Sequence, residues 1–385
     1  MQQISLGKTL DIEVVERELA SLWHVVEPAP NERAAAADAD EVESPVLRAR
    51  AANLLVYVAN QTTLAEVHQL LPELTATHPS RVLAIFGDDP APDQDIEMYV
   101  AAFSQQEKGP KRLCCEEVTL KAQGSFISEL PSAALPLLVS DLPTFLWWRA
   151  SLGAQRRVFD SLFHAADRLI IDSVEFAQPI AELKAVNNLY AKQPEVGISD
   201  LNWARLTSWR GLLADFYDVA AYQSGLNAID HVSIHYVSPK ADADAIAPQA
   251  LLMAGWLASR LKWTISESSS AKRKQEQISF EFHTAAQRSI TVELVRVSES
   301  SIRPGRLALV ELRAPDEISF GVERSKDGQL VIAEAKLGGG VQRGRVLPVR
   351  NRSTAQLLTR EMEILCNDRI YQEALVVAAT MIEKL

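Results

Sequence analysis

Apolar residues follow different spacings along this chain, and each spacing predicts a different element. Between Leu10 and Val26 they recur every three or four positions, which predicts an opening helix with one buried face. The continuous apolar run NLLVYVAN, residues 53–60, predicts a strand that is buried on both faces. Thr63 and Glu66 have capping-box spacing at the start of a helix, and RVLAIFG, residues 81–87, predicts a second buried strand.

Strand, helix and strand in this order predict a parallel unit, so residues 46–227 are expected to form an N-terminal α/β domain with Rossmann-like layers and a mostly parallel sheet. EMYVAAFS and LCCEEVTLKA are expected to add a hairpin to this sheet, and TFLWWRA and DRLIIDSV to supply later strands. Two trailing helices are expected, one within residues 177–192 and one beginning at residue 199 or 200. The first strand-to-helix turn, VANQTTLAE, contains no glycine, so the domain is expected to lack a phosphate loop.

Short runs that alternate apolar and polar residues begin after residue 228, from HVSIHYV to GQLVIAEAKL, and predict an antiparallel sheet. A helix within residues 247–262 interrupts the series, and one long helix is expected from Ser353 to Leu385. The expected domains are an N-terminal helix, a flexible acidic linker, the α/β domain with its trailing helices, and a C-terminal α+β domain, at residues 1–26, 27–45, 46–227 and 228–385.

Charge and hydropathy narrow the class of protein. The net charge of -11 and the pI near 5.3 argue against a nucleic-acid partner, because phosphate-binding surfaces are rich in Lys and Arg. The most apolar segment, LPLLVSDLPTFLWWRA, is shorter than the roughly 20 residues that cross a bilayer, so no membrane contact is expected. The first residues lack the pattern of a signal peptide, and we expect a cytoplasmic protein.

Motifs for catalysis, cofactors or metals are not found in the sequence. There is no Walker-type phosphate loop and no nucleophile elbow. His231 and His235 would share one face of a strand, but no neighbouring Cys, Asp or Glu completes a zinc set, so no metal and no cofactor are expected. The glycine cluster KLGGGVQRG, residues 336–344, is followed by further arginines; it is either an anion-binding loop or a flexible turn.

The three cysteines, Cys114, Cys115 and Cys366, are expected to be reduced thiols rather than a disulfide framework. Two of them are adjacent in a predicted strand, where a buried thiol behaves as a small apolar side chain. If one is exposed, the three become candidate redox residues.

Three segments carry a resemblance to a known family. LPLLVSDLPTFLWWRA, DRLIIDS and DLNWARLTSWRGLLADFYD, in this order and spacing, resemble the glucose-6-phosphate dehydrogenase assembly protein OpcA family of cyanobacteria and actinobacteria. The resemblance implies a non-catalytic partner that binds glucose-6-phosphate dehydrogenase, promotes its active oligomer and activates it allosterically, supporting NADPH production in the oxidative pentose phosphate pathway. It also implies redox control through thioredoxin as a second partner.

Tryptophan and arginine are enriched at interface hot spots, so the residues of these segments are candidates for partner binding. The same tryptophans are also expected in the core, since neighbouring strand residues face opposite sides. The candidates, with the basic residues of the glycine segment, are Trp147, Trp148, Arg149, Trp203, Arg205, Trp209, Arg210, Lys336, Arg343 and Arg345. An alternative function is a sugar-phosphate- or nucleotide-binding enzyme or sensor that uses the basic glycine-rich loop 336–352.

Overall fold

The computed structural model describes most of the chain, and the predicted linker at residues 27–45 lies outside the described residues. The described ranges are 2–4, 12–26, 46–48, 50–88, 90–106, 112–239, 245–267, 270–337, 340–349, 352–364 and 367–385. No helix within these ranges is long and apolar enough to cross a membrane.

The chain divides into two compact units, and both are assembled from segments distant in sequence. The first unit comprises Met1–Ile171, Glu195–Ser199 and Ser353–Asn367, and the second Asp172–Pro194, Asp200–Arg352 and Asp368–Leu385. The sequence placed a boundary near residue 228. The structure instead groups the helices between residues 172 and 227 with the second unit, because they pack against its sheet and helices.

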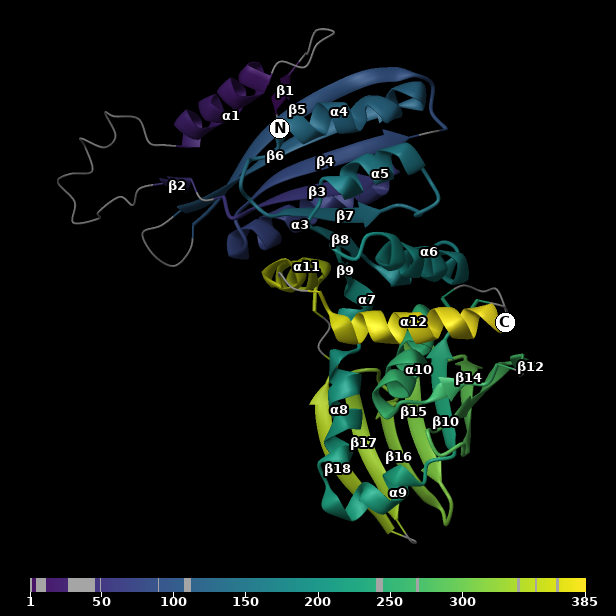
Figure 1. Cartoon of the computed structure of the whole chain (residues 1–385). Helices are drawn as coiled ribbons and strands as arrows, with labels where there is room; N and C mark the ends of the chain where they lie inside the picture. Colours follow the sequence, from purple (N-terminus) through teal and green to yellow (C-terminus); the bar gives the residue numbers. More distant parts are fainter. Residues whose placement is uncertain are drawn as a thin grey trace, which may run out of the picture. The chain divides into compact units, whose positions relative to one another are not determined.

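The first unit is built on a mostly parallel sheet, which Figure 1 shows in purple, blue and teal. The inner strands β4, β3, β7 and β8 are parallel, and the β5–β6 hairpin extends them, as the sequence predicts. All residues of β3 are buried because helices cover both faces of the sheet. The strand order is β1 (Gln2–Ile4), β5 (Gln94–Gln106), β6 (Arg112–Gln123), β4 (Ser80–Asp88), β3 (Ala52–Val58), β7 (Thr144–Arg149), β8 (Arg168–Ile171) and β9 (Gly197–Asp200), with β2 (Val46–Arg48) on β6.

Helices of the first unit lie on both faces of this sheet, with α4 and α5 on one face and α3 on the other (Figure 1). The predicted cap of α3 is wrong by three residues: Asn60 Oδ1 accepts the Thr63 amide at 2.8 Å, so Asn60 is the N-cap. The α-helices are α1 (Ile12–Val26), α3 (Gln61–Thr77), α4 (Leu130–Ala134), α5 (Arg156–His164) and α11 (Thr354–Glu363), which packs on α3.

The second unit is built on an antiparallel sheet in which β10 and β14 form a parallel pair. Burial alternates along its strands, as in β13, because every second side chain points toward the helices. The order is β11 (Thr264–Ile265), β13 (Gln277–His283), β14 (Ser289–Val297), β10 (His231–Val237), β15 (Leu307–Ala314), β16 (Ile318–Arg324), β17 (Leu330–Leu337) and β18 (Gly340–Pro348), with β12 (Lys272–Lys274) on β13.

Helices cover one face of this second sheet. The α10 helix packs on β10 and β14, α8 on β16 and β17, and α12 packs against α10 (Figure 1). The single helix predicted from residue 353 to 385 is wrong, because Asp368 caps a new helix by accepting the Tyr371 amide at 3.0 Å. The helices are α6 (Pro179–Lys192), α7 (Leu201–Ala204), α8 (Thr207–Tyr217), α9 (Gln223–Asn227), α10 (Pro248–Leu261) and α12 (Arg369–Glu383).

A buried polar network holds α7 within the second unit. Asp200 is 1% exposed, and its Oδ1 accepts the amides of Ser173 at 3.0 Å and Asn202 at 2.8 Å. Its Oδ2 is buried without a hydrogen bond to a described residue. Burial, and then the charge of Asp172, raise the pKa of Asp200 to about 6.

We expect Gly255→Ala in α10 to destabilise the protein by about 3 kcal/mol, at the upper end of overpacking costs. A Cβ at Gly255 would lie 2.1 Å from the Ala374 carbonyl oxygen of α12, so the two helices must separate. Gly211 in α8 is the matched control: it is exposed and no atom lies within 4 Å of a Cβ there. Gly211→Ala should therefore stabilise by about 0.5–1 kcal/mol, as chemical unfolding would show. Equal effects of the two changes would contradict this packing.

We expect Asp200 to make the protein less stable as pH rises from about 4 to about 6. In this window the folded state retains a proton that the unfolded chain has released, since the folded pKa is about 6 and the ordinary value is 3.8. Asp200→Asn keeps an oxygen acceptor for the two amides and cannot ionise. Chemical unfolding at pH 4.5 and at pH 8 provides the measurement. Between these two pH values, the free energy of unfolding of the wild type should fall by about 1–3 kcal/mol more than that of the variant. If the free energies of unfolding of the two proteins changed equally with pH, the raised pKa of Asp200 would be refuted.

Candidate partner-docking site

The tryptophans of the first family-like segment are part of the core of the first unit. Trp147 is 1% and Trp148 is 3% exposed on β7. Trp148 stacks on Tyr57 of the neighbouring strand β3 with 4.1 Å between ring centroids. Arg149 donates to Glu66 Oε2 at 2.9 Å and lies over the Trp147 ring. The indoles thus offer almost no surface to a partner.

The second family-like segment is likewise packed into its own unit. Trp203 and Trp209 are 4% and 3% exposed, and Trp203 Nε1 donates to Asp368 Oδ2 at 2.9 Å. The Arg210 guanidinium lies 3.5 Å from the Trp203 ring centroid, and Arg205 donates two 2.7 Å hydrogen bonds to Asp172. These side chains join elements of the unit, and their role in partner binding stays a prediction.

The glycine segment forms strands, which corrects the loop expected at residues 336–352. Strands β17 and β18 pair along it as an antiparallel hairpin. Lys336 is exposed at the end of β17, and Arg345 donates to Asp215 Oδ2 at 2.9 Å. Arg343 lies in β18, but its side chain is outside the described part of the chain. The paired residues have extended backbone, whereas an anion-binding nest needs successive amides in a turn conformation.

The cysteines differ in what the structure describes. Cys115 is 3% exposed, its thiol donates to the Thr75 carbonyl at 3.5 Å, and burial raises the pKa of this thiol. A raised pKa and burial both lower the reactivity of a thiol. The Cys114 side chain and all of Cys366 lie outside the described residues. Redox activity therefore stays a prediction for these two.

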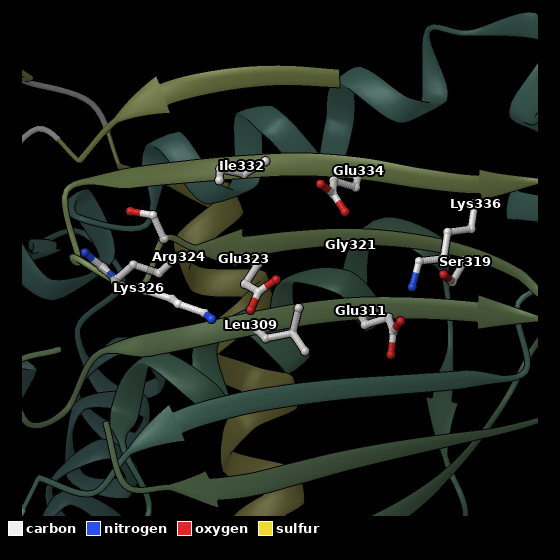
Figure 2. Close-up of a pocket in the computed structure, with 11 residues that line it drawn as sticks. Leu309, Glu311, Ser319, Gly321, Glu323, Arg324, Lys326, Ile332, Glu334 and Lys336 are labelled. Carbon is white, nitrogen blue, oxygen red and sulfur yellow. The ribbon is translucent and has the colours of Figure 1, made fainter. Parts of the chain in front are cut away.

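A hollow of about 450 Å³ lies on the face of the second sheet opposite the helices (Figure 2). Gly321 of β16 is at its centre, in register with Glu311 of β15 and Glu334 of β17. Since neighbouring strands are about 4.8 Å apart, the two carboxylates arise roughly 10 Å from one another, with no side chain between them. The missing side chain at Gly321 therefore creates the depression.

Polar and apolar side chains surround this hollow in rows. Leu309, Glu323 and Ile332 are in register across the same three strands, which places an apolar side chain on each side of a carboxylate. Lys326 and Lys336 stand at opposite ends of the hollow, as Figure 2 shows. A partly apolar floor with carboxylates at its sides suits a long cationic side chain, whose stem packs while its charged end pairs.

The sheet face next to the hollow lacks the geometry for nucleophilic catalysis. His235 Nε2 lies 2.9 Å from the Ser233 hydroxyl, and burial lowers the pKa of this imidazole. Ser233 is 4% exposed, however, and its strand is paired along both edges, so its amides serve the ladders rather than a developing oxyanion. Within the described part of the chain, no group of three or more His, Cys, Asp or Glu residues is arranged to hold a metal.

Sequence reasoning missed Glu311, Gly321 and Glu334 as a site. Their alternation with apolar residues is visible in EISFGVER and its neighbours, and it signals an exposed face. The register that sets a glycine between two glutamates depends on strand pairing between segments, which no local spacing contains.

Two family models match the chain. Residues 72–188 match the glucose-6-phosphate dehydrogenase subunit N-terminal domain, and residues 196–375 match the corresponding C-terminal domain. Together they cover most of both described units.

Curated relatives agree with this match, and one solved structure has a similar fold. The putative OxPP cycle protein OpcA of Synechocystis sp. is 28% identical over 80% of this chain and 65% of its own length, and that of Nostoc punctiforme is 26% identical over 81% and 67%. The matched region thus spans about two thirds of these relatives. The glucose-6-phosphate 1-dehydrogenase of Mycobacterium avium has a similar fold, with a TM-score of 0.51 and 9% identity over 87% of this chain and 92% of its own. From the two family models and these relatives, we conclude that the chain belongs to the OpcA family of glucose-6-phosphate dehydrogenase assembly proteins.

Proposed function

We propose that this protein is a non-catalytic partner of glucose-6-phosphate dehydrogenase that promotes its active oligomer and activates it allosterically, and so supports NADPH production. Membership of the family motivates the choice of partner. The open face of the second sheet is the observation that carries the docking role, because its hollow combines half-buried carboxylates with an apolar floor.

The chemistry of the hollow identifies what the dehydrogenase would present. An Arg or Lys side chain entering above Gly321 would pack its aliphatic stem beside Leu309 or Ile332 and pair its charge with Glu311 or Glu334. Exposed Val341 and Val346, at 59% and 49%, continue the apolar surface onto β18. Such a contact, surrounded by weaker ones, is the usual arrangement of an interface hot spot.

Activation requires that this contact favour one state of the dehydrogenase. A partner that binds the active and inactive oligomers equally would shift neither population. A tenfold shift needs about 1.4 kcal/mol of differential affinity, which is within the contribution of one buried charged contact.

We expect Gly321→Leu to weaken activation of the dehydrogenase at least tenfold, because the new side chain would fill the hollow. The substitution should leave the fold intact, since the nearest atom to a Cβ there is Leu309 Cδ1 at 4.0 Å. Gly211→Leu adds the same atoms on the exposed surface of α8 and should activate like the wild type. Enzyme assays titrated with each protein, and sizing of the mixtures, provide the measurement.

The possible results separate the surface from the function. Full activation by Gly321→Leu would show that the docking face is elsewhere. If the wild-type protein changes neither the activity nor the mass of the dehydrogenase, under reducing and under oxidising conditions, the proposed function itself is wrong.

We further propose that thioredoxin or dithiothreitol alters this activation through Cys114 or Cys366. Cys115→Ser should leave the response unchanged, because the Cys115 thiol is buried and its pKa is raised. Cys114→Ser or Cys366→Ser should abolish it in the same activity assay. A response that persists after all three substitutions would place redox control in the dehydrogenase.

A further inference from the structure

Four arginines gather in the second unit where β15 begins and β16 ends. Arg306 immediately precedes β15, Arg324 ends β16, Arg303 lies in the preceding turn and Arg205 follows α7. The Arg306 guanidinium interacts electrostatically with the other three and with Asp172. Four cations from three separate segments therefore converge on one region of this unit.

The hydrogen bonds of these arginines leave much of their charge uncompensated. Arg205 donates one hydrogen bond of 2.7 Å to each carboxylate oxygen of Asp172. Arg306 Nη1 donates to the neutral Asn202 Oδ1 at 3.0 Å, and Arg324 donates to backbone carbonyls, including that of Leu307 at 3.2 Å. Arg303 is exposed and has no hydrogen bond or ion pair within the described part of the chain.

The surroundings of Arg306 disfavour its charged form. Burial, followed by the nearby Arg205, lowers the pKa of its guanidinium to about 10. A half-buried cation with cationic neighbours is destabilised until an anion joins it. The charged groups that act most strongly on Arg306 are three other guanidiniums and the carboxylate of Asp172, which Arg205 already binds.

The groups around Arg306 are held rigidly. Asn202 donates to Ser173 Oγ at 3.0 Å and its Oδ1 accepts from Gln249 Nε2 at 2.8 Å. Gln249 Oε1 in turn accepts the Leu307 amide at 3.2 Å, which ties the start of β15 to α10. The network of buried Ser173, Asn202 and Gln249 thus orients the guanidinium before any ligand arrives.

We propose that Arg303 and Arg306, supported by Arg205 and Arg324, bind the phosphoryl group of a phosphorylated small molecule. The excess of cations suits a dianion better than a carboxylate, and the planar guanidinium matches pairs of phosphate oxygens. This site is separate from the glycine-rich hairpin, it adjoins one end of the sheet hollow through Arg324, and it does not depend on the partner.

Thermal unfolding of the full chain tests the proposal with inorganic phosphate and glucose 6-phosphate as probes, against chloride at equal ionic strength. A ligand that binds the native state raises the midpoint in proportion to ln(1 + [L]/Kd), so the rise should follow a binding curve. Stabilisation by glucose 6-phosphate alone identifies an ester site, whereas equal stabilisation by both probes identifies a site for the phosphoryl group itself. No concentration-dependent rise with either probe overturns the proposal.

Arginine variants locate the site. Arg306→Gln and Arg303→Gln should each weaken probe binding about tenfold or more, because each removes charge-assisted hydrogen bonds. Arg313→Gln is the matched control, since Arg313 is exposed on β15 and its guanidinium pairs with the nearby Glu311 at 3.5 Å. Arg303 is exposed, so we expect Arg303→Gln to fold like the wild type. This variant therefore tests probe binding even if Arg306→Gln is unstable. Unchanged binding by Arg303→Gln would overturn the proposal.

Discussion

The covering of the second sheet on one face only is the constraint on which the rest of this structure depends. Every second residue of its strands must be apolar to pack under helices such as α8 and α10, and the residues between them must tolerate water. Helix α12 can approach α10 closely because Gly255 leaves room for the Ala374 carbonyl. One face of the sheet is therefore buried in the core. The other face is open to solvent, and it contains the charged residues and the hollow that we propose for docking.

The tryptophans of the two family-like segments lie in the core and not on the open sheet face. The indoles of the two family-like segments stabilise the interiors of their units, whereas the exposed sheet face uses Glu, Lys, Leu and Ile around Gly321. A segment that identifies a family is therefore a scaffold in this protein, and the surface proposed for docking lies on strands with ordinary composition. Large aromatic residues stabilise cores as strongly as interfaces, so their enrichment does not by itself distinguish the two.

Buried polar groups are concentrated in the second unit, around α7 and the start of β15. Asp200, Asn202 and Gln249 are all at most 2% exposed, and they connect Ser173, α10 and β15 through hydrogen bonds. Buried networks of this kind orient their members, and the desolvation that accompanies them raises the pKa of Asp200 and lowers that of Arg306. Rigid orientation of charge is what the proposed phosphoryl site would use.

Local patterns by themselves determined most strands, most helices, the two sheet types and the family resemblance of this protein. NLLVYVAN and RVLAIFG are strands because continuous apolar runs need burial on both faces, and the alternating runs after residue 228 need it on one. Tertiary structure alone decided that residues 354–363 and 369–383 are separate helices in different units, that Gly321 lies between two glutamates, and that four arginines meet beside Asp172. These features arise from contacts between residues distant in sequence, whereas periodicity reports only which side of its own element a residue faces.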